Sequence, residues 1–371
     1  MVKYTIKGWC PSYLTPAQGK DGLFLRITPD KGYLSLKKAL LICNVSIKYG
    51  NGLIDLTNRG RIQIRGIKDK DLNNINNILV ENNIIKQNNN HLIISPFWKK
   101  NDKNIYFYQL LKKSFLSFPS LPDKFCIAVD LGESPVLSEL SADIRLEHAK
   151  NGQMIIRADG SPLGKKITSE DLVENTILLS EYFAKNFSKK TRRMSQLINK
   201  NFINNNWFQT LPADYKLPSM SVISKIGIYF GTKFGRVESD NLKNLLMSSK
   251  PTRIRVTPYR SFILEKGSDV VDKNFVNNMK APISKIHACP GIFSCSSSSI
   301  NTHKIASEIS YLTNKEVHVS GCVKGCAHPK KSNITLVGNE GLIDVIYDGK
   351  PTDKPNMKLL SREEVLKKVN F

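Results

Sequence analysis

The sequence predicts an α+β protein in which one folding unit occurs twice, with pseudo-two-fold symmetry between the copies. Two observations lead to this prediction. Strand and helix patterns are mixed along the chain, and one order of elements (strand, helix, strand, turn, strand) recurs at an offset of roughly 200 residues. The copies begin at Gly22 and Gly227 and share little identity. Because a duplicated fold often forms its site between the copies, we expect a cleft that both copies line.

The helix of the first copy is marked at both ends. Ser35 is typical of an N-cap, and Gly50 follows the last apolar position, so the sequence indicates a helix between them. Its apolar face comprises Leu36, Leu40, Cys43 and Ile47. Because these positions follow the helical period, we expect Cys43 to be a core residue.

The strand after this helix alternates apolar and polar side chains. Ile62 and Ile64 alternate with Arg61, Gln63 and Arg65. In a strand these two sets lie on opposite faces. One face is therefore expected to pack, while the other carries two guanidiniums.

The remaining elements follow from the same periodicities. Residues 171–186 are typical of a second long helix, and 186–218 are polar, basic and end in prolines, as expected of a connection between two halves. Further elements are expected as a helix near 72–85, strands near 125–129, 316–320, 333–338 and 342–347, and a last short helix capped by Ser361 with Glu364.

Composition limits the class of protein. Hydrophobic residues make up 40% of the 371 residues and charged residues 23%, which is ordinary for a globular chain of roughly two or three domain-sized units. No apolar run approaches the roughly 18 residues of a membrane span. The N-terminus lacks the apolar core of a signal peptide. We therefore expect a cytoplasmic protein that does not enter membranes.

The net charge of +23 has two interpretations. It reflects a compositional bias toward Lys, Asn and Ile, or it attracts an anion such as nucleic acid or a polycarboxylate. Charge alone does not separate them. No helix-turn-helix and no interleaving of aromatic and basic residues supports nucleic acid as the partner.

The cysteines carry the clearest signal. Their number, seven, is odd and no secretion signal precedes them, which argues against a disulfide framework. Cys289 and Cys295 are separated by five residues, and Cys322 and Cys326 by three. Four thiolates are what a [4Fe–4S] cluster requires. Structural zinc pairs are usually about two to four residues apart, so the wider gap favours the cluster, with zinc and unligated core thiols as the alternatives.

Residues around the four cysteines support this interpretation. Gly321 and Gly325 flank the second pair and allow the backbone to approach a cluster and to place N–H groups near its sulfur atoms. Four histidines also lie nearby and are expected to be structural or exposed rather than metal ligands: His287, His303, His318 and His328.

The cysteine spacing resembles that of the nitrite and sulfite reductase superfamily. Within it, the chain is most similar to the precorrin-3B synthase family, in the stretches that begin at Gly19, Asn51 and Ser141. The last cysteine motif supports the same family. Reductases usually have Gly-Cys-Pro-Asn-Gly-Cys there, whereas this chain has Gly-Cys-Val-Lys-Gly-Cys-Ala-His-Pro.

The resemblance implies a duplicated reductase-like fold of ferredoxin-like half-domains and tetrapyrrole-binding domains. On this basis the expected boundaries are a first half-domain at 1–70, a first α+β domain at 71–210, a second half-domain at 211–280, and a second α+β domain with the cluster at 281–371.

The resemblance also implies a reaction. An oxygen-dependent monooxygenase of aerobic cobalamin biosynthesis converts precorrin-3A to precorrin-3B by ring hydroxylation and lactone formation. Its partners would be the tetrapyrrole and O2. No Gly-rich dinucleotide fingerprint stands out, so NADH-derived electrons would arrive from an external reductant, for example through an electron-donor protein. The alternative is a sirohaem-dependent sulfite or nitrite reductase. Sirohaem or a mononuclear non-haem iron therefore stays open as a second cofactor, and no ligand set for such an iron stands out.

The resemblance further assigns cations to the site. Arg59 matches an arginine of a reductase turn, and Lys124 matches the first of two lysines that hold a small anion in the reductases. Cys126 replaces the second lysine, which removes half of that clamp and disfavours the reductase alternative. Arg59 and Lys124 are the expected catalytic residues. The other cations expected around the carboxylates of the tetrapyrrole are Arg26, Arg61, Arg65, Arg145 and Lys324.

Overall fold

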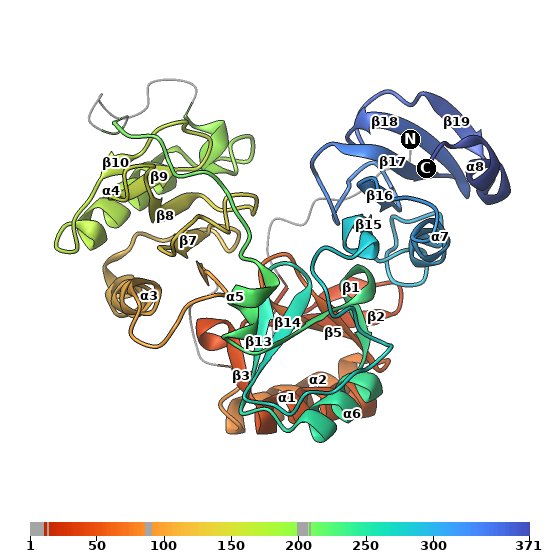
Figure 1. The fold of residues 1–371 in the computed structure, drawn as a ribbon, viewed down its shortest axis with the longest axis horizontal. Helices are drawn as coiled ribbons and strands as arrows, with labels where there is room; N and C mark the ends of the chain where they lie inside the picture. The colour runs from red at the N-terminus through yellow and green to blue at the C-terminus, as the bar shows by residue number, and fades with distance from the viewer. Residues whose placement is uncertain (1–10, 13–14, 86–90, 199–206, 208) are drawn as a thin grey trace.

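The computed structural model describes residues 11–12, 15–85, 91–198, 207 and 209–371. Within them the chain forms a base and two lobes that stand on it (Figure 1). The base contains two sheets, and each lobe contains one. Among the described residues, no helix has the length and apolar character needed to cross a membrane.

The base is built from the two copies of the repeated unit. Its first sheet has the order β1-β2-β5-β4-β12 and its second the order β11-β14-β13-β3. The strands of the first sheet are β1 (Ala17–Gly19), β2 (Gly22–Ile27), β5 (Ile62–Ile67), β4 (Leu53–Leu56) and β12 (Arg236–Glu238). Those of the second are β11 (Ile228–Gly231), β14 (Ser261–Glu265), β13 (Arg253–Thr257) and β3 (Tyr33–Ser35).

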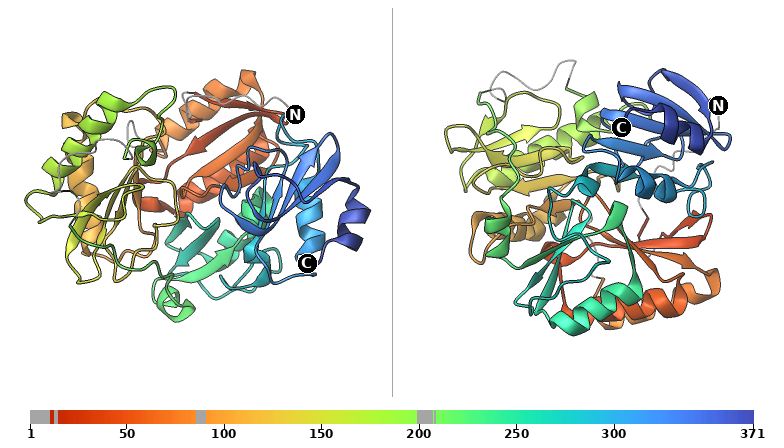
Figure 2. Two further views of the ribbon diagram at one scale, coloured as in Figure 1. Left: turned by 90° about the horizontal axis from the view of Figure 1, so that it is seen from above. Right: turned by 45° about the vertical axis from the view of Figure 1, so that its right-hand side comes forward.

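Helices complete the base. They are α1 (Leu36–Tyr49), α2 (Leu72–Glu81), α5 (Met220–Ser224) and α6 (Ser239–Ser249). Of these, α1, α2 and α6 cover the lower face of the base, on the side away from the lobes (Figures 1 and 2). The opposite face of the base is therefore the one that looks toward the lobes.

The two copies exchange strands. Strand β3 of the first copy pairs with β13 of the second, where Leu34 lies opposite Ile254. Strand β12 of the second copy pairs with β4 of the first, where Val237 lies opposite Ile54. All four side chains are buried in one core, and each contributes about 1.5 to 3 kcal/mol by its burial. The exchange therefore fixes the two copies, and the turns they carry, relative to each other.

The two lobes repeat one topology. Each sheet has three parallel strands followed by two antiparallel ones. The first lobe comprises β6 (Leu92–Ile94), α3 (Lys103–Ser114), β7 (Ile127–Asp130), β8 (Ile144–His148), β9 (Met154–Ala158), β10 (Lys165–Lys166) and α4 (Leu172–Asn186). The second comprises β15 (Ile286–Ala288), α7 (Thr302–Ile309), β16 (Val317–Ser320), β17 (Ser332–Asn339), β18 (Leu342–Gly349), β19 (Met357–Leu360) and α8 (Arg362–Lys368). The predicted α+β fold with internal duplication is therefore confirmed, and it extends to the lobes.

Most expected elements are found near their expected bounds. Ser35 caps α1 by accepting from the Lys38 N–H, and Cys43 is fully buried, as predicted. The helix expected near 72–85 ends at Glu81, because Asn83 adopts a left-handed conformation with φ +51°.

The connection expected at 186–218 does more than link two halves. Met194 is buried in the core of the first lobe, so the described part of this segment packs against the lobe that it follows. Residues 199–206 and 208 of the connection lie outside the described residues.

Candidate metal centre and ligand cleft

The four cysteines of the two motifs come from the carboxyl ends of neighbouring strands. Cys289 directly follows β15, and Cys322 lies two residues after β16, which runs parallel to β15. Burial, together with charge on each of the other three thiols, raises the pKa of Cys326 to about 12. The four sulfur atoms thus lie near enough to one another for their charges to interact. Thiolates at such a position need a positive partner, which a metal centre supplies.

Donors and a neutral ring surround the sulfur of Cys289. The Ala327 N–H donates to this Sγ at 3.4 Å, and the Ser320 hydroxyl lies 3.6 Å from it. The Nε2 atom of His318 is also 3.6 Å away. Burial lowers the pKa of His318 to about 2, so its ring is neutral. Donors of this kind orient a thiolate and tune the metal that it binds.

Backbone geometry supports the same assignment. A Cβ at Gly321 would lie 2.2 Å from the Ser298 Oγ, so only glycine fits there. Gly325 has φ +61°, which lets the chain turn between Cys322 and Cys326. The backbone N–H of Lys324, at the centre of that turn, donates to Cys322 and lowers its pKa, although burial outweighs it and raises the pKa overall. With four soft ligands and N–H donors near them, the residues fit a [4Fe–4S] cluster.

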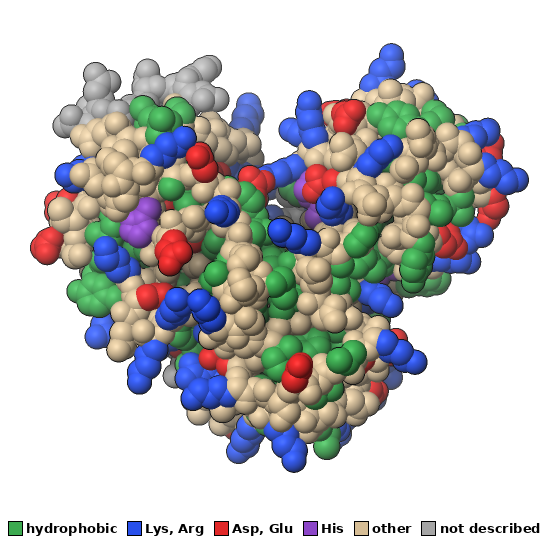
Figure 3. Space-filling view, viewed as in Figure 1, with side chains coloured by type: hydrophobic (Ala, Val, Ile, Leu, Met, Phe, Trp, Pro, Cys, Tyr) green, Lys and Arg blue, Asp and Glu red, His purple; other side chains and the backbone are tan. Residues whose placement is uncertain are grey.

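A cleft with a cavity volume of about 140 Å³ lies beside the cysteines. Both copies of the base and the second lobe line it. The charged, aromatic or thiol side chains among its walls include Arg26, Asp55, Arg236, Arg260, His303 and Cys326. Three arginines against one aspartate make the cleft cationic. Figure 3 shows that the surface is hollowed between the two lobes, with cationic side chains at the rim.

Ion pairs organise the floor of this cleft. Arg236 donates to Asp55 through Nε at 2.7 Å, and Arg65 reaches the same carboxylate at 3.2 Å. Burial opposes the charge of Asp55, but the two arginines outweigh it and hold its pKa below the usual value. Burial lowers the pKa of His303 to about 4, with Arg236 as the next cause. The cleft therefore presents a neutral imidazole beside its cations.

Arg260 joins the base to the segment that carries Cys322 and Cys326, which we call the cysteine loop. It has φ +56°, a conformation that costs a non-glycine residue about 1 kcal/mol or more. Its Nη2 donates to the Ala327 carbonyl at 2.8 Å, directly after Cys326. Burial lowers the pKa of Arg260, and negative charge on Cys289 opposes that shift. A cation held in a strained conformation beside thiols points to function.

Arg59 and Lys124, the expected catalytic residues, lie together on the side of the first lobe. The Arg59 guanidinium donates to the Lys124 carbonyl and to the Ser141 hydroxyl, each at 3.3 Å. Arg193 donates to the same carbonyl at 2.6 Å. The main chain of Lys124 is thus held by two arginines, while the residue as a whole is half-buried.

Three of the other expected cations differ in how far they reach the cleft. Arg26 lines it, where its Nε donates to the Gln63 amide oxygen at 2.8 Å. Lys324 is exposed on the cysteine loop, and Arg61 is buried. Of the three, Arg26 is therefore the one with a direct place in the cleft wall.

The last two expected cations, Arg65 and Arg145, are buried and already paired with carboxylates. Arg65 contacts Asp21 and Arg145 contacts Asp159, each at 2.8 Å. Their guanidiniums hold the fold together through these pairs. The set of residues that we propose below to face the substrate therefore leaves both out.

Sequence reasoning missed several residues of the site. Arg236, Arg260 and His303 line the cleft, and Arg193 holds the Lys124 carbonyl. One signal was available for Arg260. The repeat aligns Thr57 of the first copy with Thr257 of the second, at an offset of roughly 200 residues. This alignment places Arg260 opposite Gly60.

Comparisons with known proteins agree with this architecture. A family model described as the nitrite/sulfite reductase ferredoxin-like half domain matches residues 16–82. That range covers the first copy of the base, from β1 to α2. The expectation that the fold contains ferredoxin-like half-domains is therefore confirmed.

Two relatives match almost the whole chain. A precorrin-3B synthase of Sinorhizobium sp is 22% identical, and the match covers 94% of this chain and 84% of that protein. The NirA protein of Mycobacterium tuberculosis, a solved structure, matches with a TM-score of 0.65 and 15% identity, over 92% of this chain and 78% of that one. The resemblance expected from the cysteine motifs is confirmed. The expectation of an enzyme is confirmed as well, since the first relative is a synthase by name.

Proposed function

We propose that this chain is an oxidoreductase of cobalamin biosynthesis, which converts precorrin-3A to precorrin-3B with O2. The observation that carries the proposal is the cationic cleft with Cys326 in its wall, in a chain whose match to a precorrin-3B synthase covers 94% of its length. A cleft of this kind suits a polyanionic ligand that must lie close to a redox centre.

The cleft supplies the groups that would bind the tetrapyrrole. Arginine binds carboxylates through paired hydrogen bonds, and Arg26, Arg236 and Arg260 line the cleft. We propose that these three contact the acidic side chains of the substrate. Arg59 and Lys124 would hold the part of the ring that faces the first lobe.

The four cysteines would hold a [4Fe–4S] cluster, which when bound supplies electrons one at a time. The reaction inserts one oxygen atom of O2 into the product as a hydroxyl group and releases the other as water. This balance consumes two electrons and two protons per turnover, which an external donor must provide. The chain's own contribution is to bind the ring beside the cysteines and to hold it there.

The decisive experiment uses protein purified without oxygen. Incubation with precorrin-3A, a reductant and isotopically labelled O2 should give a product that carries one labelled oxygen atom, as mass spectrometry would detect. The visible spectrum should show the broad shoulder of a cluster alone. Stoichiometric sirohaem, or a product oxygen that comes from water, would refute the proposal.

Cysteine variants provide the matched control. Cys295→Ala should lose cluster iron and turnover together. Cys43→Ala removes a thiol from the core of the base, far from the motifs in sequence, and should retain both. Equal iron content in the two variants would contradict the assignment of the ligands.

A further inference from the structure

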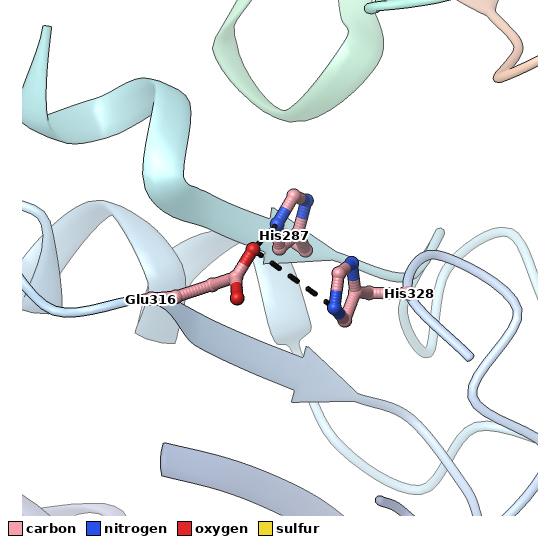
Figure 4. Close-up of side chains that lie close together, drawn as sticks. All are labelled: His287, Glu316 and His328. Atoms are coloured by element: carbon pink, nitrogen blue, oxygen red, sulfur yellow. Dashed lines mark hydrogen bonds and ion pairs between the residues drawn. The ribbon is translucent and has the colours of Figure 1, made fainter. Parts of the chain in front are cut away.

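We propose that His287, Glu316 and His328 form a second metal site, which takes one divalent transition-metal ion separately from the four cysteines. Figure 4 shows the three side chains converging from three segments of the second lobe. Each offers one ligand atom, and the three atoms all lie within 4.8 Å of one another. The inference concerns metal binding and does not depend on the tetrapyrrole assignment.

The sheet places the first two ligands. His287 is the middle residue of β15, and Glu316 directly precedes β16, the neighbouring parallel strand. The His287 Nε2 lies 3.1 Å from the Glu316 Oε1. Hydrogen bonds from the strand pairing hold both backbones. The two side chains therefore lose little conformational freedom when they bind an ion.

The cysteine loop places the third ligand. The His328 ring stacks on the His287 ring with centroids 4.2 Å apart, and its Nε2 lies 3.9 Å from the same Glu316 oxygen. The Ala327 carbonyl, just before His328, accepts from Arg260 at 2.8 Å. That contact fixes the loop, and with it the position of the imidazole.

The spacing of these atoms is close to that of a bound ion. Ligands about 2.1 Å from a metal lie roughly 3 to 3.5 Å from each other. The two separations from Glu316, 3.1 and 3.9 Å, need a shift of less than about 1 Å to meet that range. One of the two stacked imidazoles must also turn so that both ring nitrogens face the same ion. Two imidazoles and one carboxylate suit a first-row transition metal and leave coordination positions open for another ligand.

The site is accessible yet close to the thiols. The exposed fractions of the three side chains are 23% for His287, 42% for Glu316 and 15% for His328, so an ion could enter from solvent. The buried ring of His318 lies between the two groups. It meets the His328 ring edge-on, with centroids 5.9 Å apart, and its Nε2 is 3.6 Å from the Cys289 Sγ. An ion here would therefore be linked to the cysteine centre by two successive side-chain contacts, His328 with His318 and His318 with Cys289.

A simple ion pair between His287 and Glu316 is the competing explanation, in which the His328 Nε2 pairs instead with the Lys331 carbonyl, 3.3 Å away. Cobalt(II) separates the two explanations because its visible spectrum reports its ligands. Anaerobic titration of the cluster-loaded chain should show one cobalt bound per chain, without the intense charge-transfer band of cobalt–thiolate bonds. Glu316→Gln should weaken that binding at least about tenfold.

Two further variants keep the test decisive. Glu340→Gln changes a carboxylate elsewhere in the second lobe, at an exposed turn, and should bind cobalt as the parent does. Glu316→Asp keeps a carboxylate and should bind more tightly than Glu316→Gln at equal cluster content. Unchanged cobalt affinity in Glu316→Gln, no cobalt bound by the parent, or a thiolate charge-transfer band would each overturn the proposal.

Discussion

The two lobes share a topology but differ in the side chains at the ends of their strands. The residue after the first strand is Ser95 in the first lobe and Cys289 in the second, and the second strand ends at Asp130 in one and at Ser320 in the other. The carboxyl ends of parallel strands are where such sheets commonly bind ligands. One scaffold therefore provides two such edges, and a few substitutions decide whether an edge offers thiol ligands.

Both edges disfavour negative charge. Burial raises the pKa of Asp130 to about 7, although the Val136 and Leu137 N–H groups favour its charged form. Burial likewise raises the pKa of Cys326 to about 12. In the first lobe, Asp130 can remain neutral by keeping its proton. The second lobe gathers four thiols, which a bound metal would hold as thiolates.

The largest expected effect comes from changing the matched residues after the first strands. Cys289→Ala should abolish the cluster and lower turnover by about a thousandfold or more, because a cofactor carries the redox chemistry. Ser95→Ala, at the corresponding position of the first lobe, should retain cluster and activity. Iron and sulfide content with turnover measures both. Loss of the cluster in Ser95→Ala would show that the lobes are not functionally distinct.

Local patterns made much of this fold predictable. Ser35 is a typical N-cap and Gly50 is typical of a helix end, so these two residues predict the helix between them. The capping box of Ser361 with Glu364 also forms as expected. The exchange of β3 and β12 between the copies was not predictable, since three-residue strands carry little periodicity and their partners lie far away in sequence.

The candidate site was predictable only in part. The cysteines stand out by their spacing, whereas the pairing of Arg65 and Arg145 depends on Asp21 and Asp159, which no spacing rule connects to them. Charge alone does not tell a guanidinium that binds substrate from one that holds a fold together. That distinction requires the tertiary contacts.

The next largest effect is expected from the two arginines through which the base contacts the lobes. Arg59 contacts the first lobe and Arg260 the second. Arg260→Gly should weaken substrate binding about 10- to 100-fold, the value of one or two charged hydrogen bonds. Thermal stability should change little, because the relief of left-handed strain, which Gly60 avoids in the first copy, offsets the lost contact to Ala327. KM and melting temperature together measure this.

A matched variant sharpens that test. Arg59→Ala removes the corresponding contact to the first lobe. If both variants bind substrate as well as the parent does, neither cation faces it. If Arg260→Gly lowers stability by several kcal/mol instead, its contact to Ala327 is structural.

A moderate effect should appear in the pH dependence of stability. The pKa of Asp130 rises from the ordinary 3.8 to about 7 on folding, so the folded state holds its proton more tightly. The contribution of this group to stability is greatest below about pH 4, falls as the pH rises toward 7, and levels off above. The fall should be on the order of 2 to 4 kcal/mol.

Asp130→Asn should remove this pH dependence, because the amide does not ionise in that range. Urea unfolding at several pH values, followed by the fluorescence of Trp98 and Trp207 in the core of the first lobe, measures the slope. An equally steep slope in Asp130→Asn would assign the titration to another group.

The smallest effect concerns the contact across the two lobes. Lys330, two residues after His328, forms an ion pair with Glu139 of the first lobe. Both side chains are about half exposed, and exposed pairs contribute at most about 1 kcal/mol. Glu139→Gln should therefore leave stability within about 0.5 kcal/mol. It should increase the rate at which substrate leaves the hollow, if the pair limits the separation of the lobes. Because salt screens exposed charges, high ionic strength should reproduce the effect in the parent chain and add nothing in Glu139→Gln. A substrate release rate that responds to salt equally in both chains would exclude this pair as the link between the lobes.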